Sequence, residues 1–203
     1  MSPARLETFA DGVFAIAATL LILTVDGAVR GEGIDLSASL THAWPAYVGY
    51  VVSFLTIGIM WVNHHTIMSL VVRVDRRFLI ANLGLLMCIA FVPFPTRLIA
   101  ENIRGAGAES AALAYGFTLT ATAIFFNVVW FYAAVGRRLL RADADPRVVA
   151  GITRTYRVGP WIYLGATLVA FASATASAIL YLAITALYIF ESSIFGGRET
   201  IPD

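Results

Sequence analysis

An uncharged apolar segment near the start of the chain constrains the fold more than any other feature. Between Asp11 and Asp26 the sequence holds no charge, and its only polar side chains are those of Thr19 and Thr24. With the turns before it, the segment over residues 6–26 has about 20 residues, the length at which a helix crosses a bilayer core. A cleaved signal peptide fits less well, because Asp11 interrupts the start of the apolar run and no Ala-x-Ala cleavage site lies directly before Asp26.

The rest of the chain is also strongly apolar. Hydrophobic residues make up 59% of its 203 residues and charged residues 13%, with a mean hydropathy of +0.80. Soluble domains carry about 25% charged residues, so we expect an all-α, polytopic membrane protein with a single transmembrane domain over residues 1–203. Pro93 and Pro95 should kink or end the third span. The expected six spans cover residues 6–26, 44–72, 78–99, 111–135, 158–172 and 175–190, and residues 191–203 form a polar tail.

The last two expected spans come from one apolar stretch, residues 158–190. At a rise of about 1.5 Å per residue the stretch is too long for one ordinary span and a little short for two full ones. Two short helices are one interpretation, and one long tilted helix is the other.

The arginines orient the chain. With six spans, both termini lie on one side of the membrane together with eleven of the fourteen arginines. Cytoplasmic loops of membrane proteins carry an excess of Lys and Arg, so the sequence predicts a multi-pass protein with both termini cytoplasmic. The eleven are Arg5, Arg73, Arg76, Arg77, the six arginines of residues 137–157, and Arg198.

The first segment has two different faces when it is drawn as a helix. Ile16, Leu20 and Leu23 fall within roughly 60° of one another and form a narrow apolar stripe. Phe9 extends this stripe, and Thr19 lies beside it. Ordinary packing against lipid or a neighbouring helix is the alternative interpretation of such a stripe.

Asp11 points roughly 140° away from Ile16 and needs a partner, because an acid in a membrane helix is costly to leave alone. The second segment offers polar side chains at a similar depth, which predicts a network that clamps the first two helices. Adjacent histidines project about 100° apart, so they do not indicate a metal site. The expected network contains Arg5, Asp11, Asn63 and one of His64 or His65.

Three motifs together point to a known family. The first segment opens with Arg5-x-x-x-Phe9-Ala10-Asp11 and continues as Ile-x-x-Thr-Leu-x-x-Leu, and residues 61–65 and 91–95 add Trp-Val-Asn-His-His and Phe-Val-Pro-Phe-Pro. These resemble the signatures of the transmembrane-protein-175 potassium channels of lysosomes and prokaryotes. The resemblance spans the first three segments clearly and the others only by hydropathy. Ala10 stands where the family usually has serine, so no role of that hydroxyl carries over.

The resemblance implies a cation channel in which the first helix of each subunit lines a central pore. It implies that Ile16, Leu20 and Leu23 narrow the pore and that Thr19 influences selectivity beside them. It also implies that Arg5 and Asp11 interact with a histidine of the second helix. A single six-helix chain would be the prokaryotic type, which assembles as a homotetramer in the plasma membrane.

The residues fit such a channel independently. No Thr-Val-Gly-Tyr-Gly-like filter is present, and apolar rings cannot replace a hydration shell, so we expect a hydrophobic gate with weak selectivity among monovalent cations. The resemblance implies that this weak selectivity favours potassium. Apart from the permeant K⁺ we expect no cofactor, and the partners are the bilayer and further copies of the chain. No basic block suggests nucleic acid, and no nucleophile–base or His-Glu-x-x-His motif suggests an enzyme. A small secondary transporter and a non-conducting membrane scaffold are the alternatives.

Overall fold

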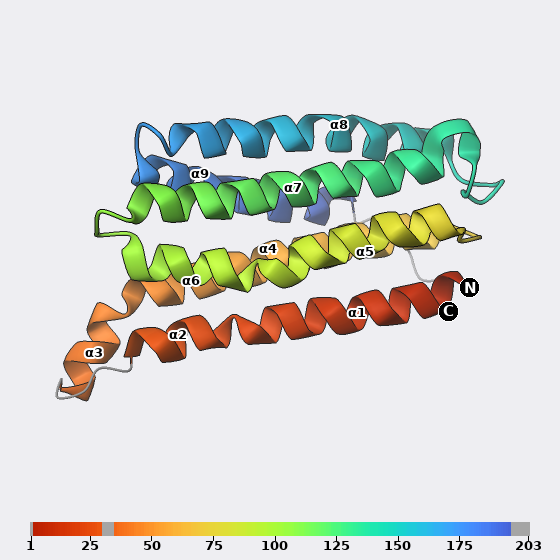
Figure 1. Ribbon diagram of the computed structural model, residues 1–203. Helices are drawn as coiled ribbons and strands as arrows, with labels where there is room; N and C mark the ends of the chain where they lie inside the picture. The colour runs from red at the N-terminus through yellow and green to blue at the C-terminus, as the bar shows by residue number, and fades with distance from the viewer. Residues whose placement is uncertain (1, 30–34, 196–203) are drawn as a thin grey trace.

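The computed structural model describes residues 2–29 and 35–195, with side chains through Tyr188, and this part of the chain is helical apart from short connections (Figure 1). The helices α1 (Pro3–Leu20) and α2 (Ile22–Val29) run almost end to end, because Leu21 between them keeps right-handed helical angles of φ −59° and ψ −26°. The later elements are α3 (Leu36–His42), α4 (Trp44–Leu70), α5 (Arg76–Phe91), α6 (Pro93–Asn102), α7 (Ala108–Ala134), a 3-10 turn (Val135–Arg137), α8 (Pro146–Val169) and α9 (Ala174–Phe195).

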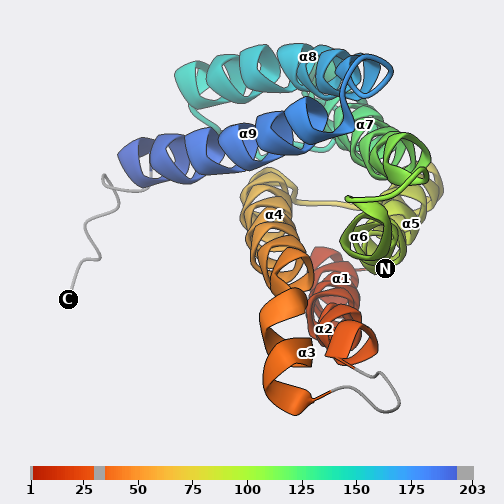
Figure 2. The same ribbon diagram turned by 90° about the vertical axis from the view of Figure 1, so that its left-hand side faces the viewer.

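The long helices lie side by side as a bundle (Figure 1). Viewed along the bundle, α1 and α2 form one edge, α8 and α9 form the opposite edge, and α4, α5, α6 and α7 lie between them (Figure 2). Accordingly α1 packs against α4 and α5, while α7 packs against α5, α6 and α8. This arrangement leaves one side of α1 uncovered by the rest of the described chain.

The third apolar segment is interrupted at Val92, between α5 and α6. Pro93 and Pro95 lack backbone N–H groups and cannot donate to the turn before them. At the interruption the Val92 N–H donates to the Ile89 carbonyl over 3.1 Å, and the Thr96 N–H donates to the Val92 carbonyl over 3.2 Å. The chain therefore changes from α5 to α6 with little loss of hydrogen bonding.

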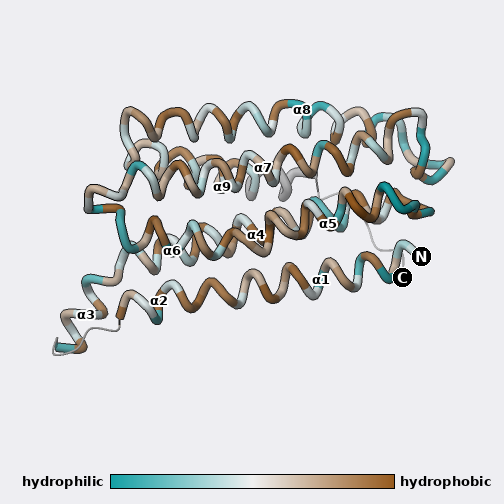
Figure 3. Tube along the Cα trace, viewed as in Figure 1, coloured by the Kyte–Doolittle hydropathy of each residue, from teal (hydrophilic) through white to brown (hydrophobic). Residues whose placement is uncertain are grey.

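Polar side chains are distributed in two ways that suit a membrane. Hydrophilic residues gather at the ends of the bundle, and apolar residues run along its length (Figure 3). Inside, hydroxyl groups bond to one another between helices: Ser53 lies 2.8 Å from Thr96 and 3.2 Å from Tyr115, and Thr56 lies 3.0 Å from Thr185. Such hydroxyl contacts help membrane helices associate, because lipid tails are as apolar as the helices and the hydrophobic effect therefore contributes little to their packing.

The prediction of six transmembrane helices is wrong, although an all-helical membrane protein is supported. In the described chain four stretches are long and apolar enough to cross a membrane: Pro3–Val29, Trp44–Leu70, Arg76–Asn102 and Ala108–Arg137. The predicted span at 158–172 belongs to α8, which begins at Pro146 and carries the charges of Arg147, Arg154 and Arg157. The predicted span at 175–190 belongs to α9, whose described apolar stretch Ala174–Tyr188 is not among these four.

The structure divides the last apolar stretch into two helices, since α8 ends at Val169 and α9 begins at Ala174. The Ser173 hydroxyl accepts a hydrogen bond from the Ala176 N–H over 3.2 Å at the start of α9. The predicted polar tail begins within α9, which reaches Phe195, and its residues 196–203 lie outside the described chain.

The loop between α4 and α5 contacts the loop between α7 and α8, at the end of the bundle where the chain begins. A single β-bridge links Val71 to Leu140, and the Arg73 guanidinium donates twice to the Arg138 carbonyl, at 3.1 and 2.7 Å. Asp75 caps α5 by accepting from the Phe78 N–H, and it also accepts a 2.6 Å bond from the Tyr132 hydroxyl. These bonds, the one from Tyr132 first, hold the pKa of Asp75 below its ordinary value.

Candidate functional site

The helix α1 has one buried and one exposed face. Ala10 and Ala17 are almost completely buried, and their small side chains let α1 approach its neighbours closely. The Ala10 methyl group needs no hydrogen-bond partner in this contact. The buried face consists of Leu6, Ala10, Phe14, Ala17 and Leu21.

The predicted stripe lies on the exposed face. The exposed fractions are 61% for Ile16, 43% for Leu20 and 55% for Leu23, with 52% for Phe9 at one end. Thr19 is exposed beside them, and its hydroxyl donates to the Ile16 carbonyl over 2.9 Å. The described chain thus presents a continuous apolar row to its surroundings, at the edge of the bundle opposite α8 (Figure 2).

Asp11 turns away from this row and meets α4. Its Oδ1 accepts a 2.8 Å hydrogen bond from the Trp61 indole N–H. One turn earlier on α1, Glu7 Oε1 lies 2.8 Å from His65 Nδ1. The rings of Trp61 and His65 are stacked with centroids 6.2 Å apart, so the two contacts form one continuous strip across the helix pair. We call this set of four side chains, Glu7, Asp11, Trp61 and His65, the acidic clamp.

His64 points into the core of the bundle. It is fully buried, its Nε2 lies 2.9 Å from Asn82 Oδ1, and its ring lies 5.6 Å from that of Phe14. The Asn82 amide nitrogen donates to the Phe78 carbonyl, which leaves Oδ1 as acceptor and assigns the imidazole proton to Nε2. His64 Nδ1 is buried without a partner in the described chain. This histidine therefore connects α4 to α5.

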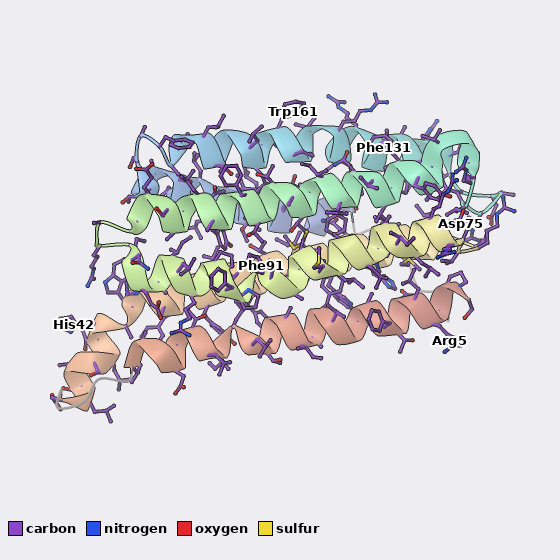
Figure 4. All side chains as sticks on the ribbon, in the orientation of Figure 1. Arg5, His42, Asp75, Phe91, Phe131 and Trp161 are labelled. Atoms are coloured by element: carbon purple, nitrogen blue, oxygen red, sulfur yellow. The ribbon has the colours of Figure 1, made fainter. Side chains whose placement is uncertain are left out.

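The structure brings together only part of the predicted network. Asp11 hydrogen-bonds to Trp61 and to neither histidine, and His65 lies within hydrogen-bond distance of Glu7 instead. Arg5 is exposed at the end of the bundle that also holds Asp75 (Figure 4), with no hydrogen bond to the described chain. Asn63 lines a small, partly open pocket of about 50 Å³, together with Asn127 and Tyr156. A functional role for these residues stays a prediction.

Glu7, Trp61 and Asn82 are contact partners that the sequence analysis did not assign. The acidic clamp had a readable signal, because Glu7 and Asp11 are four residues apart, as are Trp61 and His65. Residues four apart share a helix face, so two such pairs can meet when two helices run antiparallel. The sequence contains no comparable pair of residues that would indicate Asn82 as a partner of His64. In the described chain no group of three or more His, Cys, Asp or Glu side chains could hold a metal ion.

The fold and the site define a multi-pass α-helical membrane protein whose first helix offers an uncovered apolar row. The sequence model of the family described as "Endosomal/lysosomal potassium channel TMEM175" matches residues 5–93, which include most of α1 and all of α4 and α5. The chain belongs to this TMEM175 family, which is a family of potassium channels and not of enzymes.

Several relatives match over most of their length. A potassium channel of Chamaesiphon minutus is 46% identical over 171 residues, covering 83% of this chain and 84% of the relative. A potassium channel of Streptomyces collinus is 45% identical over 159 residues, covering 76% and 73%. The crystal structure of a lysosomal potassium-selective channel TMEM175 homolog from Chamaesiphon minutus superposes with a TM-score of 0.85 at 40% identity, covering 94% of this chain and 97% of that one.

Proposed function

We propose that the protein is a potassium-preferring, weakly selective cation channel that assembles as a homotetramer around the exposed row of α1. In this assembly Ile16, Leu20 and Leu23 from four copies form the narrow part of the pore. K⁺ is the permeant ion, and no further cofactor takes part. The potassium channels of Chamaesiphon minutus and Streptomyces collinus support the choice of ion.

The observation that carries the proposal is the pair of opposed faces on α1. One face is buried against α4 and α5, while the row of Ile16, Leu20 and Leu23 is 61%, 43% and 55% exposed and uncharged. The acids of α1 that could disturb an apolar constriction, Glu7 and Asp11, bond to α4 instead. A helix held in this way can present one fixed row to an axis shared with other copies.

The chemistry of the row determines what kind of channel it can form. Isoleucine and leucine side chains offer no oxygen to replace ion hydration, so a narrow ring of them blocks ions by dewetting and conducts when it widens. Selectivity is then weak, since the pore holds no ring of carbonyls. The Thr19 hydroxyl, beside the row, is the nearest polar group that could favour one cation over another.

The proposal places the protein in the plasma membrane of a prokaryote, with its N-terminus in the cytoplasm. The bacterial relatives support the membrane. The arginine-rich loops at residues 73–77 and 137–141 lie at the same end of the bundle as the start of α1 (Figures 1 and 4), which supports the orientation. The C-terminus lies outside the described residues.

The test is flux from vesicles that contain the purified protein, with potassium compared with sodium. Wild-type protein should conduct both ions and favour potassium. Ile16→Asn adds a polar group to the constriction, and Leu23→Ala widens it, so both should raise sodium flux and bring the ratio of potassium to sodium flux closer to one.

Ile22→Asn is the matched control. Ile22 is 51% exposed on α2 but points about 120° away from Ile16, so its substitution should leave the flux ratio unchanged. If the Ile16 and Leu23 variants behave like wild type, the row does not line the pore. If the wild-type protein conducts neither ion, the alternatives of a small transporter or a scaffold take the place of the channel.

A further inference from the structure

An open groove lies between α7 and α8, at the edge of the molecule farthest from α1. Its volume is about 520 Å³, and its walls are mainly apolar. In Figure 4 the labelled Trp161 lies on α8 at this outer edge, with Phe131 of α7 nearby. The side chains that matter for its chemistry are Ile124, Val128 and Phe131 of α7 with Arg157, Trp161 and Leu164 of α8.

One end of the groove is positively charged. Arg157 is the only charged side chain among the described residues that line it. Its guanidinium carbon lies 5.7 Å from the centre of the Phe131 ring, so the cation is held against an aromatic face. Neither the guanidinium of Arg157 nor the indole N–H of Trp161 donates a hydrogen bond to the described chain. Both therefore have donors available for a ligand.

The backbone around Arg157 is held firmly. Pro160 has no N–H to donate to the Tyr156 carbonyl one turn before it. The Asn127 amide donates to that carbonyl instead, over 2.8 Å, and the Trp130 indole donates to Thr153 over 3.0 Å. These bonds tie α8 to α7 on both sides of Arg157, so the position of the charge is determined by the fold.

The charged end of the groove lies toward the polar end of the bundle that holds Asp75. Phe131 is next to Tyr132, whose hydroxyl bonds to Asp75 in the polar loop before α5. From there the groove follows α7 back to Thr120, which at a rise of about 1.5 Å per residue is about 16 Å. That is close to half of a hydrocarbon core of about 30 Å, the depth of one leaflet.

We propose that this groove binds one anionic phospholipid of the leaflet facing that end of the bundle, with the phosphate at Arg157 and Trp161 and an acyl chain against Ile124 and Val128. Charge complementarity favours an anionic headgroup, and exposed tryptophan is favoured at the membrane interface. The location of the groove away from the pore rests on the proposed function, but the binding itself does not require conduction.

The test is native mass spectrometry of the purified, delipidated full-length protein with added phospholipid. Phosphatidylglycerol and phosphatidylcholine with identical palmitoyl and oleoyl chains are compared. We expect wild-type protein to retain phosphatidylglycerol preferentially, and Arg157→Gln to bind it about five-fold more weakly, the effect of one arginine near an anionic surface. Arg104→Gln is the matched control, since Arg104 also lies over an aromatic ring, that of Trp44, at the other end of the bundle.

Val128→Trp is a second variant, which fills the groove from an exposed position and keeps Arg157. It should also reduce retention of phosphatidylglycerol. Millimolar inorganic phosphate should not displace the lipid, because phosphate lacks the acyl chain; displacement would show that a free anion is the ligand and would overturn the proposal.

Equal retention of the two lipids by wild-type protein would also overturn the proposal of a lipid site. An equal loss of phosphatidylglycerol binding in the Arg157 and Arg104 variants would do the same. So would a change of oligomeric mass in Val128→Trp, because the groove would then be covered by another copy. Lipid retention is measured without current, so a non-conducting protein that still binds phosphatidylglycerol would contradict only the proposed function.

Discussion

The Trp61 indole N–H donates to the Asp11 carboxyl group at the surface of the α1–α4 pair. Both side chains are partly exposed, so the net contribution to stability should be about 1 kcal/mol. Trp61→Phe removes the donor and keeps most of the apolar ring. We expect the melting temperature of the detergent-purified protein to fall by about 2–4 °C, the shift for 1 kcal/mol in a chain of this length.

A double-mutant cycle separates the bond from the loss of the two side chains. Asp11→Ala and Trp61→Phe should each lower the melting temperature, and their combination should lower it by less than the sum. Asp11→Asn keeps the acceptor oxygen and should lower it less than Asp11→Ala. Additive effects would mean that the two side chains act independently.

The partner of Asp11 shows what periodicity can and cannot predict for a single residue. The sequence placed Asp11 away from Ile16, and the structure agrees in turning it toward α4. Which residue of α4 receives it depends on how that helix is rotated about its axis. A rotation of about 100° exchanges His64 for its neighbour His65, and hydropathy does not determine it. Trp61 and His65 therefore face α1, while His64 faces Asn82.

The N-terminal cap of α5, Asp75, should make the stability of the protein depend on pH. The Tyr132 hydroxyl and the Phe78 N–H lower the pKa of Asp75 below its ordinary value of 3.8. An acid with a lowered folded pKa stabilises the fold above its unfolded pKa, and the stabilisation is lost as the pH falls through the folded pKa. Wild-type protein should therefore lose stability below about pH 5 in part through Asp75.

Melting temperatures measured from pH 7 to pH 3 test this expectation. The difference between wild type and Asp75→Asn should be constant at neutral pH and shrink in acid. Tyr132→Phe removes the largest cause of the lowered pKa, so the pH dependence should be shallower in that variant. A difference that does not vary with pH would exclude Asp75 as the titrating group.

At the level of the helices, the prediction of separate C-terminal spans at 158–172 and 175–190 was wrong. The arginine-rich segment before residue 158 contains a helix start that the sequence shows plainly. Asp145 precedes Pro146, and the Asp145 carboxylate accepts from the Arg147 N–H over 2.8 Å. An acidic N-cap followed by proline in the first turn is a standard helix start. Hydropathy alone does not detect this signal, and it therefore predicted a separate span at 158–172, where α8 continues from Pro146.

Close packing between α7, α8 and α9 depends on Gly116. A Cβ atom at this position would overlap the hydroxyl groups of Tyr181 and Thr167, which are hydrogen-bonded to each other over 3.1 Å. We expect Gly116→Ala to lower the free energy of unfolding by about 2 kcal/mol, because overpacking outweighs the helix preference of alanine. Gly165→Ala on α8, where a Cβ atom meets nothing within 4 Å, should be neutral or stabilising in the same thermal assay. Equal stability of the two variants would show that the contact relaxes freely.

For the whole molecule, composition predicted an all-helical membrane protein, and the periodicity of residues 6–26 predicted the face of α1 that is exposed. Neither could show how the faces of other copies meet, because contacts between subunits leave the same apolar pattern as contacts with lipid. The signature around Arg5 and Asp11 supplied the family instead. The arrangement of the copies therefore has to be tested by proximity.

Oxidative cross-linking tests whether the row on α1 faces other copies. In a Cys88→Ser background, a cysteine introduced by Ile16→Cys should form disulfide-linked dimers in membranes treated with a mild oxidant, because four copies of this position would converge on one axis. A cysteine introduced by Trp161→Cys has a similar exposure, 72% against 61%, but lies at the opposite edge of the bundle and should stay monomeric on a denaturing gel. Cross-linking at 161 and not at 16 would place the contact between copies at α8, and the row of Ile16, Leu20 and Leu23 would then face lipid.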